Sequence, residues 1–520
     1  MKNILIFFTS VFLFTVTSFA SGDFFRIYNR ADITDYGQPS FPRYLSLLGL
    51  SNRHTLITLD GRKINSFQDG NANLNHIPIR LIENIEIQKG INSVLDGPNV
   101  LGGAVNILTS EPDSEIPYTC LYSIWGTSGL ENYGLNFKNQ NGSLRYSVFA
   151  EKIFSRGYGF YKESNRYNAV SLYAKMHWYY NPKTWFTITT SKYEDNVGAP
   201  KNKHLQLKYE THQSKTALKI RFYGDKAGSE QNNSTQGNEA TIEQKVGKYH
   251  LIRVGRDHHW NKYANVSNKE DAFYYEDEIN LNDLTFTIGQ RHDKNSLFTK
   301  EKSPRFRLNY QLEDKTILFL SAGQGISFPY KDNPNLVTEK GRVYTLGFKK
   351  ILSDFVSLNL TGYFADVENF LLCDMEDVTS VTSKGAETEI LFAVNEKINI
   401  QTIYTYLLTE DKEIKKSLPC RPENKFKTNL SYKNKKHNGD LLWTIVLSHE
   451  YQGDRYANRE NFIILKSFST VNLSINMKLA RAFTVNFSVN NLDNDEYSLV
   501  WGYPMPRRNF SGGIIWEFWD

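Results

Sequence analysis

From about residue 118 to the C-terminus, apolar and polar residues alternate along many short stretches of the chain. Near the end, TVNLSINMKLA and FTVNFSVNN place every second residue on one apolar side, and VSLNLTGYF from Val356 does the same. On the first stretch the apolar side holds Val471, Leu473, Ile475, Met477 and Leu479. A period of two is typical of β-strands with one apolar and one polar face. The chain is therefore expected to form a long succession of strands.

Two all-β architectures fit this alternation. In a soluble sandwich or propeller the apolar faces form a core, whereas in a membrane barrel they contact lipid and the polar faces line the lumen. Aromatic residues make up 14% of the chain and there are only 15 prolines, and membrane barrels place aromatic girdles at both interfaces. The mean hydropathy of -0.49 excludes a bundle of membrane helices. The pattern favours an all-β transmembrane barrel.

Residues 21–112 have a different pattern. HTLITLDG from His54, IENIEIQKG from Ile82 and GGAVNILT from Gly102 predict short strands, and IPIRLI from Ile77 predicts a helical turn. The stretch SEPDSEIP, residues 110–117, contains two prolines and three acidic residues, which is typical of a boundary. We expect a small mixed α/β domain over residues 21–112 and the barrel over residues 113–520.

The N-terminal residues 1–20 have the layout of a secretory signal peptide. Lys2 precedes an apolar run that ends in the small residues Ser18 and Ala20, so cleavage after Ala20 is expected. An N-terminal membrane anchor is the alternative, but the run is short for a span of about 20 residues. The exported chain keeps three widely spaced cysteines without metal-site spacing, Cys120, Cys373 and Cys420. They are expected to be separate small apolar residues, although Cys373 and Cys420 could pair in an oxidising compartment.

The net charge and the glycine-rich segment argue against two functions, nucleic-acid binding and phosphate binding by a loop. The net charge is only +5 and no long basic run is present, so nucleic acid is not an expected partner. The glycine-dense GPNVLGGAVN, residues 97–106, raises the possibility of a phosphate-binding loop. That loop would need a Lys followed by Ser or Thr, or a helix after its last glycine. Neither is present, so these glycines are expected to serve tight turns.

Three consecutive motifs in the N-terminal domain resemble the plug domain of TonB-dependent outer-membrane receptors. The family pattern is an LxDG strand, then IExIEVxRGP, then a turn followed by GGVINI. The matching positions are Leu59, Asp60, Gly61, Ile82, Glu83, Ile85, Glu86, Lys89, Gly90, Gly97, Gly102, Gly103, Val105, Asn106 and Ile107. The resemblance implies a structural or gating role for Asp60, Gly61, Glu83, Glu86, Lys89, Gly90, Gly97, Gly102, Gly103 and Asn106.

The resemblance continues through the barrel. SRGYGFYKESNRYNAVSLYAKMHW looks like an early barrel segment of the cobalamin and siderophore receptor branch, and DNPNLVTEKGRVYTLGFK resembles the NPxLKPE turn. RPENKFKTNLSY and the segment from Asn490 to the C-terminus are similar to late strands of the family. The family implies about 22 antiparallel strands, and a barrel this wide leaks unless its lumen is plugged. The small domain in front is the expected plug.

Some positions depart from the family pattern. Only SGDFFRIYNRA lies between the signal and Asp32, with DFFRIYN as a candidate for the segment that pairs with the energising periplasmic protein. Leu48 and Gly49 replace an Arg-Gly pair, Asp96 replaces an aromatic residue, and Asp520 follows the terminal Trp519. These departures leave open a plugged pore or ligand-binding barrel that has lost energy coupling.

Histidines and acidic groups offer little chemistry. Four histidines could act as ligands, but each is expected to be an ordinary solvated residue: His54, His76, His258 and His259. No metal site or cofactor is predicted. The acidic groups at residues 374–377 and 493–496 adjoin turn signals and are expected to be solvated loops. A barrel hydrolase would need a nucleophile motif such as GxSxG, which the sequence lacks, so no catalytic residues are predicted.

The aromatic stretches WGYPMP, residues 501–506, and SFPYKD, residues 327–332, are expected at barrel ends. There they serve either a bulky ligand or the membrane interface. What the resemblance implies is an outer-membrane receptor of a Gram-negative bacterium that imports a scarce bulky metal chelate, such as a ferric siderophore or cobalamin. A TonB-type inner-membrane energising complex, acting through its periplasmic partner protein, would drive plug rearrangement. The RGY and GYPMP segments favour a corrinoid or small chelate, and the substrate-binding residues are not predicted.

Overall fold

The computed structural model describes residues 31–112, 114–158, 166–196, 201–227, 233–263, 266–298, 300–313, 315–329, 336–372, 378–435, 441–479 and 482–519. The predicted signal peptide, residues 21–30, Cys373 and the acidic residues 374–377 lie outside this range, so their predictions remain untested.

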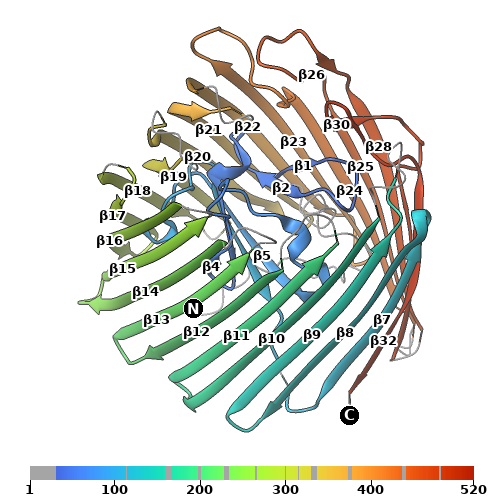
Figure 1. The fold of residues 1–520 in the computed structure, drawn as a ribbon, viewed down its shortest axis with the longest axis horizontal. Coiled ribbons are helices and arrows are strands. Elements are labelled where there is room, and N and C mark those ends of the chain that lie inside the picture. Colours follow the sequence, from blue (N-terminus) through green and yellow to red (C-terminus); the bar gives the residue numbers. More distant parts are fainter. Residues whose placement is uncertain are drawn as a thin grey trace.

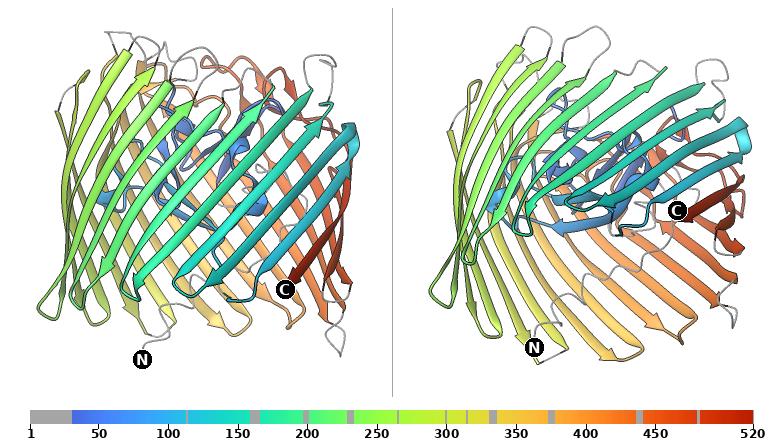
Figure 2. Two further views of the ribbon diagram at one scale, coloured as in Figure 1. Left: turned by 60° about the horizontal axis from the view of Figure 1, so that its bottom comes forward. Right: turned by 90° about the horizontal axis from the view of Figure 1, so that it is seen from below.

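Twenty-two antiparallel strands form one closed barrel, as predicted (Figures 1 and 2). The last strand pairs with the first, with Trp519 opposite Tyr118, so no sheet edge is left open. In chain order the barrel strands are β7 (Tyr118–Gly126), β8 (Leu130–Asn141), β9 (Leu144–Ser155), β10 (Tyr167–Asn181), β11 (Thr184–Asp195), β12 (Asn202–His212), β13 (Thr216–Ala227), β14 (Asn233–Val246), β15 (His250–Tyr263), β16 (Val266–Leu281), β17 (Leu284–Asn295), β18 (Lys300–Leu312), β19 (Thr316–Ser327), β20 (Glu339–Ser353), β21 (Val356–Leu371), β22 (Val378–Ala393), β23 (Ile398–Asp411), β24 (Asn424–Lys435), β25 (Leu441–Gln452), β28 (Phe468–Leu479), β29 (Phe483–Asn490) and β32 (Asn509–Trp519).

The alternation in the sequence becomes the two faces of this wall. Along β10, Val170, Leu172 and Met176 are exposed on the outside, while Tyr173 and Lys175 between them are buried on the lumen side. The outward residues would contact lipid and the inward ones contact the plug, as expected for a membrane barrel. Among the described residues, no helix combines the length and apolar character needed to cross a membrane.

The two ends of the barrel differ. At one end the strands are joined by tight turns, such as residues 142–143, 182–183 and 282–283, and the C-terminal end of β32 lies at this end (Figure 2). At the other end the connections are longer, such as residues 412–423 and 453–467, and they include the short strands β26 (Arg455–Tyr456), β27 (Ile464–Leu465), β30 (Ser498–Val500) and β31 (Tyr503–Pro504). Outer-membrane barrels have short periplasmic turns and longer extracellular loops, which orients the molecule.

The described residues before the barrel, 31–112, occupy its lumen (Figures 1 and 2). Their main sheet has the order β4-β3-β6-β5, with β3 parallel to β6 and the other neighbours antiparallel. The elements are β1 (Asp32–Asp35), β2 (Arg43–Ser46), β3 (Thr55–Leu59), β4 (Arg62–Lys63), β5 (Ile82–Lys89) and β6 (Gly103–Thr109), with the short 3-10 helices η1 (Asn52–His54), η2 (Leu74–His76), η3 (Ile79–Leu81) and η4 (Val94–Asp96). A further 3-10 turn, η5 (Thr127–Gly129), joins β7 to β8.

The apolar core of this lumen domain is continuous with one side of the wall. Leu50, Ile91 and Leu101 of the plug are fully buried, in one cluster with Val343, Val367 and Val381 of strands β20 to β22. Burial of apolar side chains is the main stabilising contribution here, at about 25 cal/mol per Å² of area removed from water. Apolar packing therefore contributes to holding the plug on this side of the wall.

Candidate functional site

The predicted motif residues Asp60 and Gly61 form the two-residue turn of the β3–β4 hairpin. Both have positive φ, 50° and 79°, which suits the tight turn that matches strand twist. This turn aims the Asp60 carboxylate at the end of β6 and at the wall. The backbone N–H of Thr109 donates to it at 2.9 Å, and the hydroxyls of Thr109 and Tyr173 each donate at 2.8 Å.

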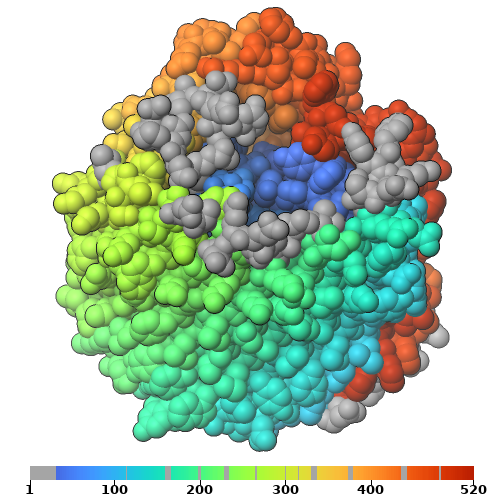
Figure 3. Space-filling model, in the orientation of Figure 1, coloured from blue at the N-terminus to red at the C-terminus, as the bar shows by residue number. Residues whose placement is uncertain are grey.

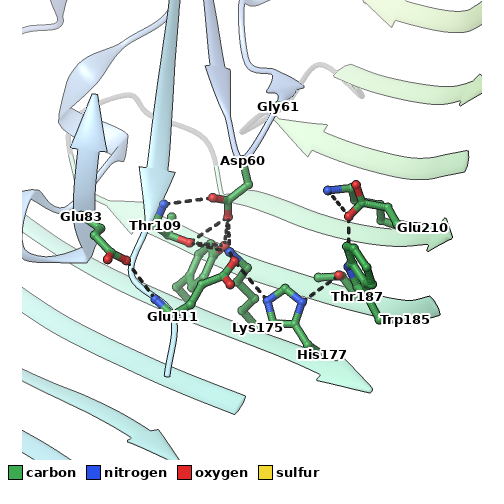
Figure 4. A network of polar contacts seen from close by, with 12 residues as sticks. Asp60, Gly61, Glu83, Thr109, Glu111, Lys175, His177, Trp185, Thr187 and Glu210 are labelled. Atoms are coloured by element: carbon green, nitrogen blue, oxygen red, sulfur yellow. Dashed lines mark hydrogen bonds and ion pairs between the residues drawn. The ribbon is translucent and has the colours of Figure 1, made fainter. Parts of the chain in front are cut away.

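Asp60 also joins an ion-pair network with strand β10 (Figure 4). Lys175 Nζ lies 3.2 Å from Asp60 Oδ2 and 2.6 Å from Glu111 Oε1. His177 Nε2 lies 3.2 Å from the same Glu111 oxygen. We call Asp60, Thr109, Glu111, Tyr173, Lys175 and His177 the Asp60 cluster. Burial raises the pKa of Glu111, but the contacts with His177 and Lys175 outweigh it and hold that pKa well below its usual range.

The contacts of Glu86 and Asn106 lie within the plug sheet and stabilise it. Asn106 Oδ1 accepts hydrogen bonds from Thr58 Oγ1 at 2.7 Å and from the Gly61 N–H at 3.1 Å. The Asn106 amide donates to Glu86 at 3.0 Å. Glu83 accepts from the backbone N–H of Glu111 at 3.2 Å and so supports the chain that leads into the barrel.

Lys89 and Gly90 contact the opposite sector of the wall. Lys89 Nζ pairs with Glu387 of β22 at 2.5 Å. Gly90 has φ of 74°, and a Cβ there would lie 2.7 Å from the Thr345 methyl group of β20. Only a residue without a side chain allows this close approach.

The glycine-dense segment is a contact surface rather than a phosphate loop. Arg291 and Arg305 of the wall donate to the carbonyl oxygens of Val94 and Gly97 at 3.3 and 3.1 Å. At Gly103, with φ of 134°, a Cβ would lie 2.1 Å from the carbonyl oxygen of Gln88, and at Gly102 it would lie 2.9 Å from that of Leu47. The glycines therefore permit close backbone packing inside the plug and against the arginines.

A second attachment, the Glu339 cluster, consists of Arg53, His54, Glu339 and Leu371. Arg53 Nη2 lies 2.6 Å and His54 Nε2 3.1 Å from Glu339 Oε1, which also accepts from the Leu371 N–H at 2.9 Å. Burial lowers the pKa of His54 despite the neighbouring carboxylate. His54 is fully buried here, so it is part of the plug attachment and not a ligand site open to solvent.

The other candidate histidines have separate environments. His258 points outward and pairs with Asp271 at 2.6 Å, whereas its neighbour His259 points into the lumen near Glu239 and Glu270. His76 packs on Tyr193, with ring centroids 4.4 Å apart, and burial lowers its pKa to about 4. Within the described part of the chain, no group of three or more His, Cys, Asp or Glu residues is arranged to hold a metal ion.

A cavity of about 530 Å³ lies between the plug and strands β10 to β16. We call it the vestibule. Figure 3 shows the plug, in blue, at the bottom of an opening surrounded by barrel strands. Aromatic rings of Tyr44, Phe67, Tyr167, Tyr193, Tyr223 and Tyr263 line the vestibule, together with His76 and Lys63. The size matches that of small-molecule sites, which range from about 300 to 1,000 Å³.

The floor of the vestibule is held by asparagines that hydrogen-bond to plug backbone groups. The Asn75 amide donates to Phe41 O at 2.7 Å, and Asn65 donates to Gly70 O at 2.8 Å. Asn73 caps η2 by accepting from the Asn75 N–H at 3.1 Å. These bonds fix the floor before any ligand arrives, which lowers the ordering cost of binding.

The predicted aromatic loop groups only partly face solvent. Tyr503 packs edge-on against Tyr36 and Phe41 of the plug, at 4.9 and 5.6 Å between ring centroids, while Trp501 is exposed. Phe328 is buried and stacked on Phe298, and residues 330–332 lie outside the described range. A second cavity of about 200 Å³, lined by Arg43, His449 and Met505, lies beside the hairpin of Tyr503.

The sequence did not single out the wall partners. Lys175, His177, Arg291, Arg305, Glu339 and Glu387 are lumen-facing strand residues. The alternation did contain a signal, because a charged residue at an inward position of a barrel strand needs a partner in the lumen. Which plug residue provides it depends on the orientation of the plug, which the pattern does not contain.

Comparisons with known proteins agree with this architecture. The model of the TonB-dependent receptor plug domain matches residues 27–104, and the model of the TonB-dependent receptor-like β-barrel matches residues 95–492. The vitamin B12 transporter BtuB of Photobacterium profundum is 22% identical over 90% of this chain and 85% of its own. Among solved structures, the FrpB iron transporter from Neisseria meningitidis has a TM-score of 0.82 at 14% identity, covering 97% of both chains. The siderophore receptor PirA from Acinetobacter baumannii has a TM-score of 0.80 at 14% identity, covering 95% of both.

Proposed function

The chain belongs to the TonB-dependent receptor family, and from this premise we propose that it imports a bulky metal chelate, with cobalamin the first ligand to test. Members of this family are transport proteins of the Gram-negative outer membrane and not enzymes. The substrate and the energy coupling of this chain are the parts that we propose.

The vestibule is the observation that carries the proposal. It lies on the extracellular side of the plug, it has room for a large organic ligand, and aromatic rings line it. The asparagine-fixed floor supports a preformed site, and flat aromatic surfaces suit a rigid macrocycle or a catecholate chelate. Similarity to a vitamin B12 transporter supports cobalamin as the first choice over a ferric siderophore.

Transport requires that the plug move. Several polar attachments hold it to the wall, among them the Asp60 cluster on β10 and the Glu339 cluster on β20 and β21. Removing one partner of a buried ion pair costs about 3–5 kcal/mol, so such contacts favour the seated plug over a displaced one. We propose that a TonB-type periplasmic complex supplies the force by pairing with the segment before β1, residues 22–30, as an added strand.

Growth of a receptor-deletion strain on a single chelate tests both parts. The strain carries the full chain, or the chain with residues 22–30 replaced by a Gly-Ser linker of equal length, which retains the plug from Ala31 onward. Cyanocobalamin, ferric enterobactin and ferric citrate are supplied one at a time, and surface expression is checked by antibody.

Growth of the full chain on cyanocobalamin, with loss of growth for the linker variant, supports import driven through residues 22–30. Equal growth of both supports the alternative of a plugged pore without energy coupling. Growth on a ferric chelate alone moves the substrate to the siderophores. Binding of each chelate to the purified proteins separates loss of coupling from loss of recognition.

A further inference from the structure

The outward face of strands β15 to β18 near the extracellular end is strongly basic. The register makes one contiguous surface of it, because His258 lies opposite Asp271, Asp271 opposite Lys294, and Lys294 opposite Lys300. In the adjacent row His292 lies opposite Lys302. We call the six exposed cations on this surface the basic patch: Arg256, Lys262, Lys269, Lys294, Lys300 and Lys302.

These side chains point away from the lumen. The residues that alternate with them, such as Arg291 between His292 and Gln290, are buried and contact the plug, with Arg291 donating to Val94 O. The Arg256 side chain is 70% exposed. Since successive side chains of a strand face opposite sides, the basic patch faces the membrane, at the level of the outer leaflet.

The charges of these strands are sorted by face. The carboxylates of Asp257, Asp293 and Glu301 are buried on the lumen side. Among the described outward residues of this surface, at positions 256–263, 266–273, 290–298 and 300–306, Asp271 is the only carboxylate, and His258 and Arg256 already contact it at 2.6 and 3.3 Å. This outward surface therefore carries six cations and only one carboxylate among its described residues.

This imbalance is costly without a partner. Like charges directly opposite on neighbouring strands destabilise a sheet, and Lys294 and Lys300 are such a pair. Other lysines near this end of the barrel have carboxylates beside them, as in the pairs Lys192 with Glu194 and Lys415 with Glu410. An anion from outside the chain would relieve the repulsion.

We infer that the basic patch binds the phosphorylated glucosamine head group of lipopolysaccharide in the outer leaflet. Clusters of Lys and Arg at a membrane surface bind anionic head groups. Below the patch the outward face is apolar, with Val254, Ile288 and Phe306 on the next rows. This order of cations above apolar residues matches a lipid with phosphates above its acyl chains.

The test measures binding of the purified full-length receptor in detergent to bisphosphorylated lipid A and to its dephosphorylated form by native mass spectrometry. The expected preference for the phosphorylated form is at least about tenfold. The triple variant Lys294→Gln, Lys300→Gln, Lys302→Gln should lose that preference, and the corresponding Lys→Arg variant should keep it. The triple variant Lys183→Gln, Lys245→Gln, Lys248→Gln removes three charges at the periplasmic end and should behave as wild type.

Three results would overturn the inference: equal binding of both lipids by the wild-type receptor, an unchanged preference in the patch variant, or equal loss in the periplasmic control. Displacement of lipid A by phosphatidylglycerol at equal concentration would also overturn it, because the surface would then recognise any anionic lipid. Gel mobility before and after heating confirms that each variant has a folded barrel. The substituted side chains are exposed, so folding should be retained.

Discussion

Lys175 on the barrel wall lies between two plug carboxylates, with its Nζ 3.2 Å from Asp60 Oδ2 and 2.6 Å from Glu111 Oε1. The lysine side chain is only 4% exposed. A buried cation with two anionic partners ties the turn after β3 and the chain after β6 to one strand of the wall. Movement of the plug along β10 must separate these charges.

The first prediction concerns this contact. Lys175→Met should loosen the plug, because it leaves the Asp60 carboxylate buried without its cation, at a cost of about 3–5 kcal/mol. The measurement is hydrogen exchange of residues 55–63 and 103–109 in the purified receptor, together with vancomycin sensitivity of cells. Lys192→Met removes an exposed lysine from β11 and should change neither. Equal exchange in the two variants would show that the contact does not hold the plug.

The second prediction concerns the glycine-dense segment. Gly103→Ala should destabilise the plug by at least about 2 kcal/mol, because its φ of 134° is unsuited to a side chain and its Cβ would lie 2.1 Å from a carbonyl oxygen. Gly224→Ala on β13 meets no atom within 4 Å and should be neutral. Plug protection from trypsin separates the two. A Gly103→Ala plug as resistant as wild type would contradict the argument.

Local features of the fold follow from the sequence because they depend on neighbouring residues. The period of two gave the strands and their two faces, and HTLITLDG, IENIEIQKG and GGAVNILT correspond to β3, β5 and β6 within one residue or two. Asp60 and Gly61 form the expected turn. The strand number came from the family resemblance, since alternation does not fix how many strands close a barrel.

The contacts between the plug and the wall could not be predicted from local sequence patterns, because they join residues far apart in the chain. Arg53 and Glu339 are 286 positions apart, and their pairing depends on the rotation of the plug and the register of β20. His54 illustrates the difference, because the sequence offered it as a candidate ligand or an ordinary solvated residue, whereas it is buried in the Glu339 cluster. By contrast, the opposite environments of His258 and His259 follow from the period of two, which places adjacent strand residues on opposite faces.

The third prediction concerns acid. The pKa of Glu111 is lowered in the folded protein, so its carboxylate stabilises the plug attachment fully above the ordinary carboxyl pKa of about 4.5. That contribution is lost as the pH falls through the lowered pKa. The Glu111 contribution is the difference in plug hydrogen exchange between wild type and Glu111→Gln, which should be constant from pH 8 to 5 and shrink below about pH 4.5. Histidines of the plug titrate in both proteins and therefore cancel in this difference. A difference that already shrinks between pH 7 and 6 would contradict the assignment.

The fourth prediction concerns His76 in the vestibule. Its pKa of about 4 keeps the ring neutral in the folded protein when free histidine, with a pKa of 6.5, begins to protonate. Since the unfolded chain then binds more protons, stability should decline as the pH falls from about 6.5 to 4 and change little with this group above 6.5. Nitrogen-15 NMR of labelled histidines should give the His76 midpoint near pH 4. A midpoint near 6.5 would show that the ring is solvated.

The last prediction tests the vestibule as the ligand site. Gln68 is an exposed residue of the plug floor, and it is the backbone N–H, not the side chain, that donates to Ser66 Oγ at 3.0 Å. Gln68→Trp should therefore fill part of the cavity without disturbing the plug. Because the tryptophan ring would occupy space that the ligand needs, we expect the Kd of the transported chelate to rise at least about tenfold. This change corresponds to a loss of about 1.4 kcal/mol of binding free energy. Gln213→Trp adds the same side chain to the periplasmic turn after β12 and should bind as wild type. If both variants bind the chelate equally well, the ligand does not enter the vestibule, and the smaller cavity beside Tyr503 becomes the site to test.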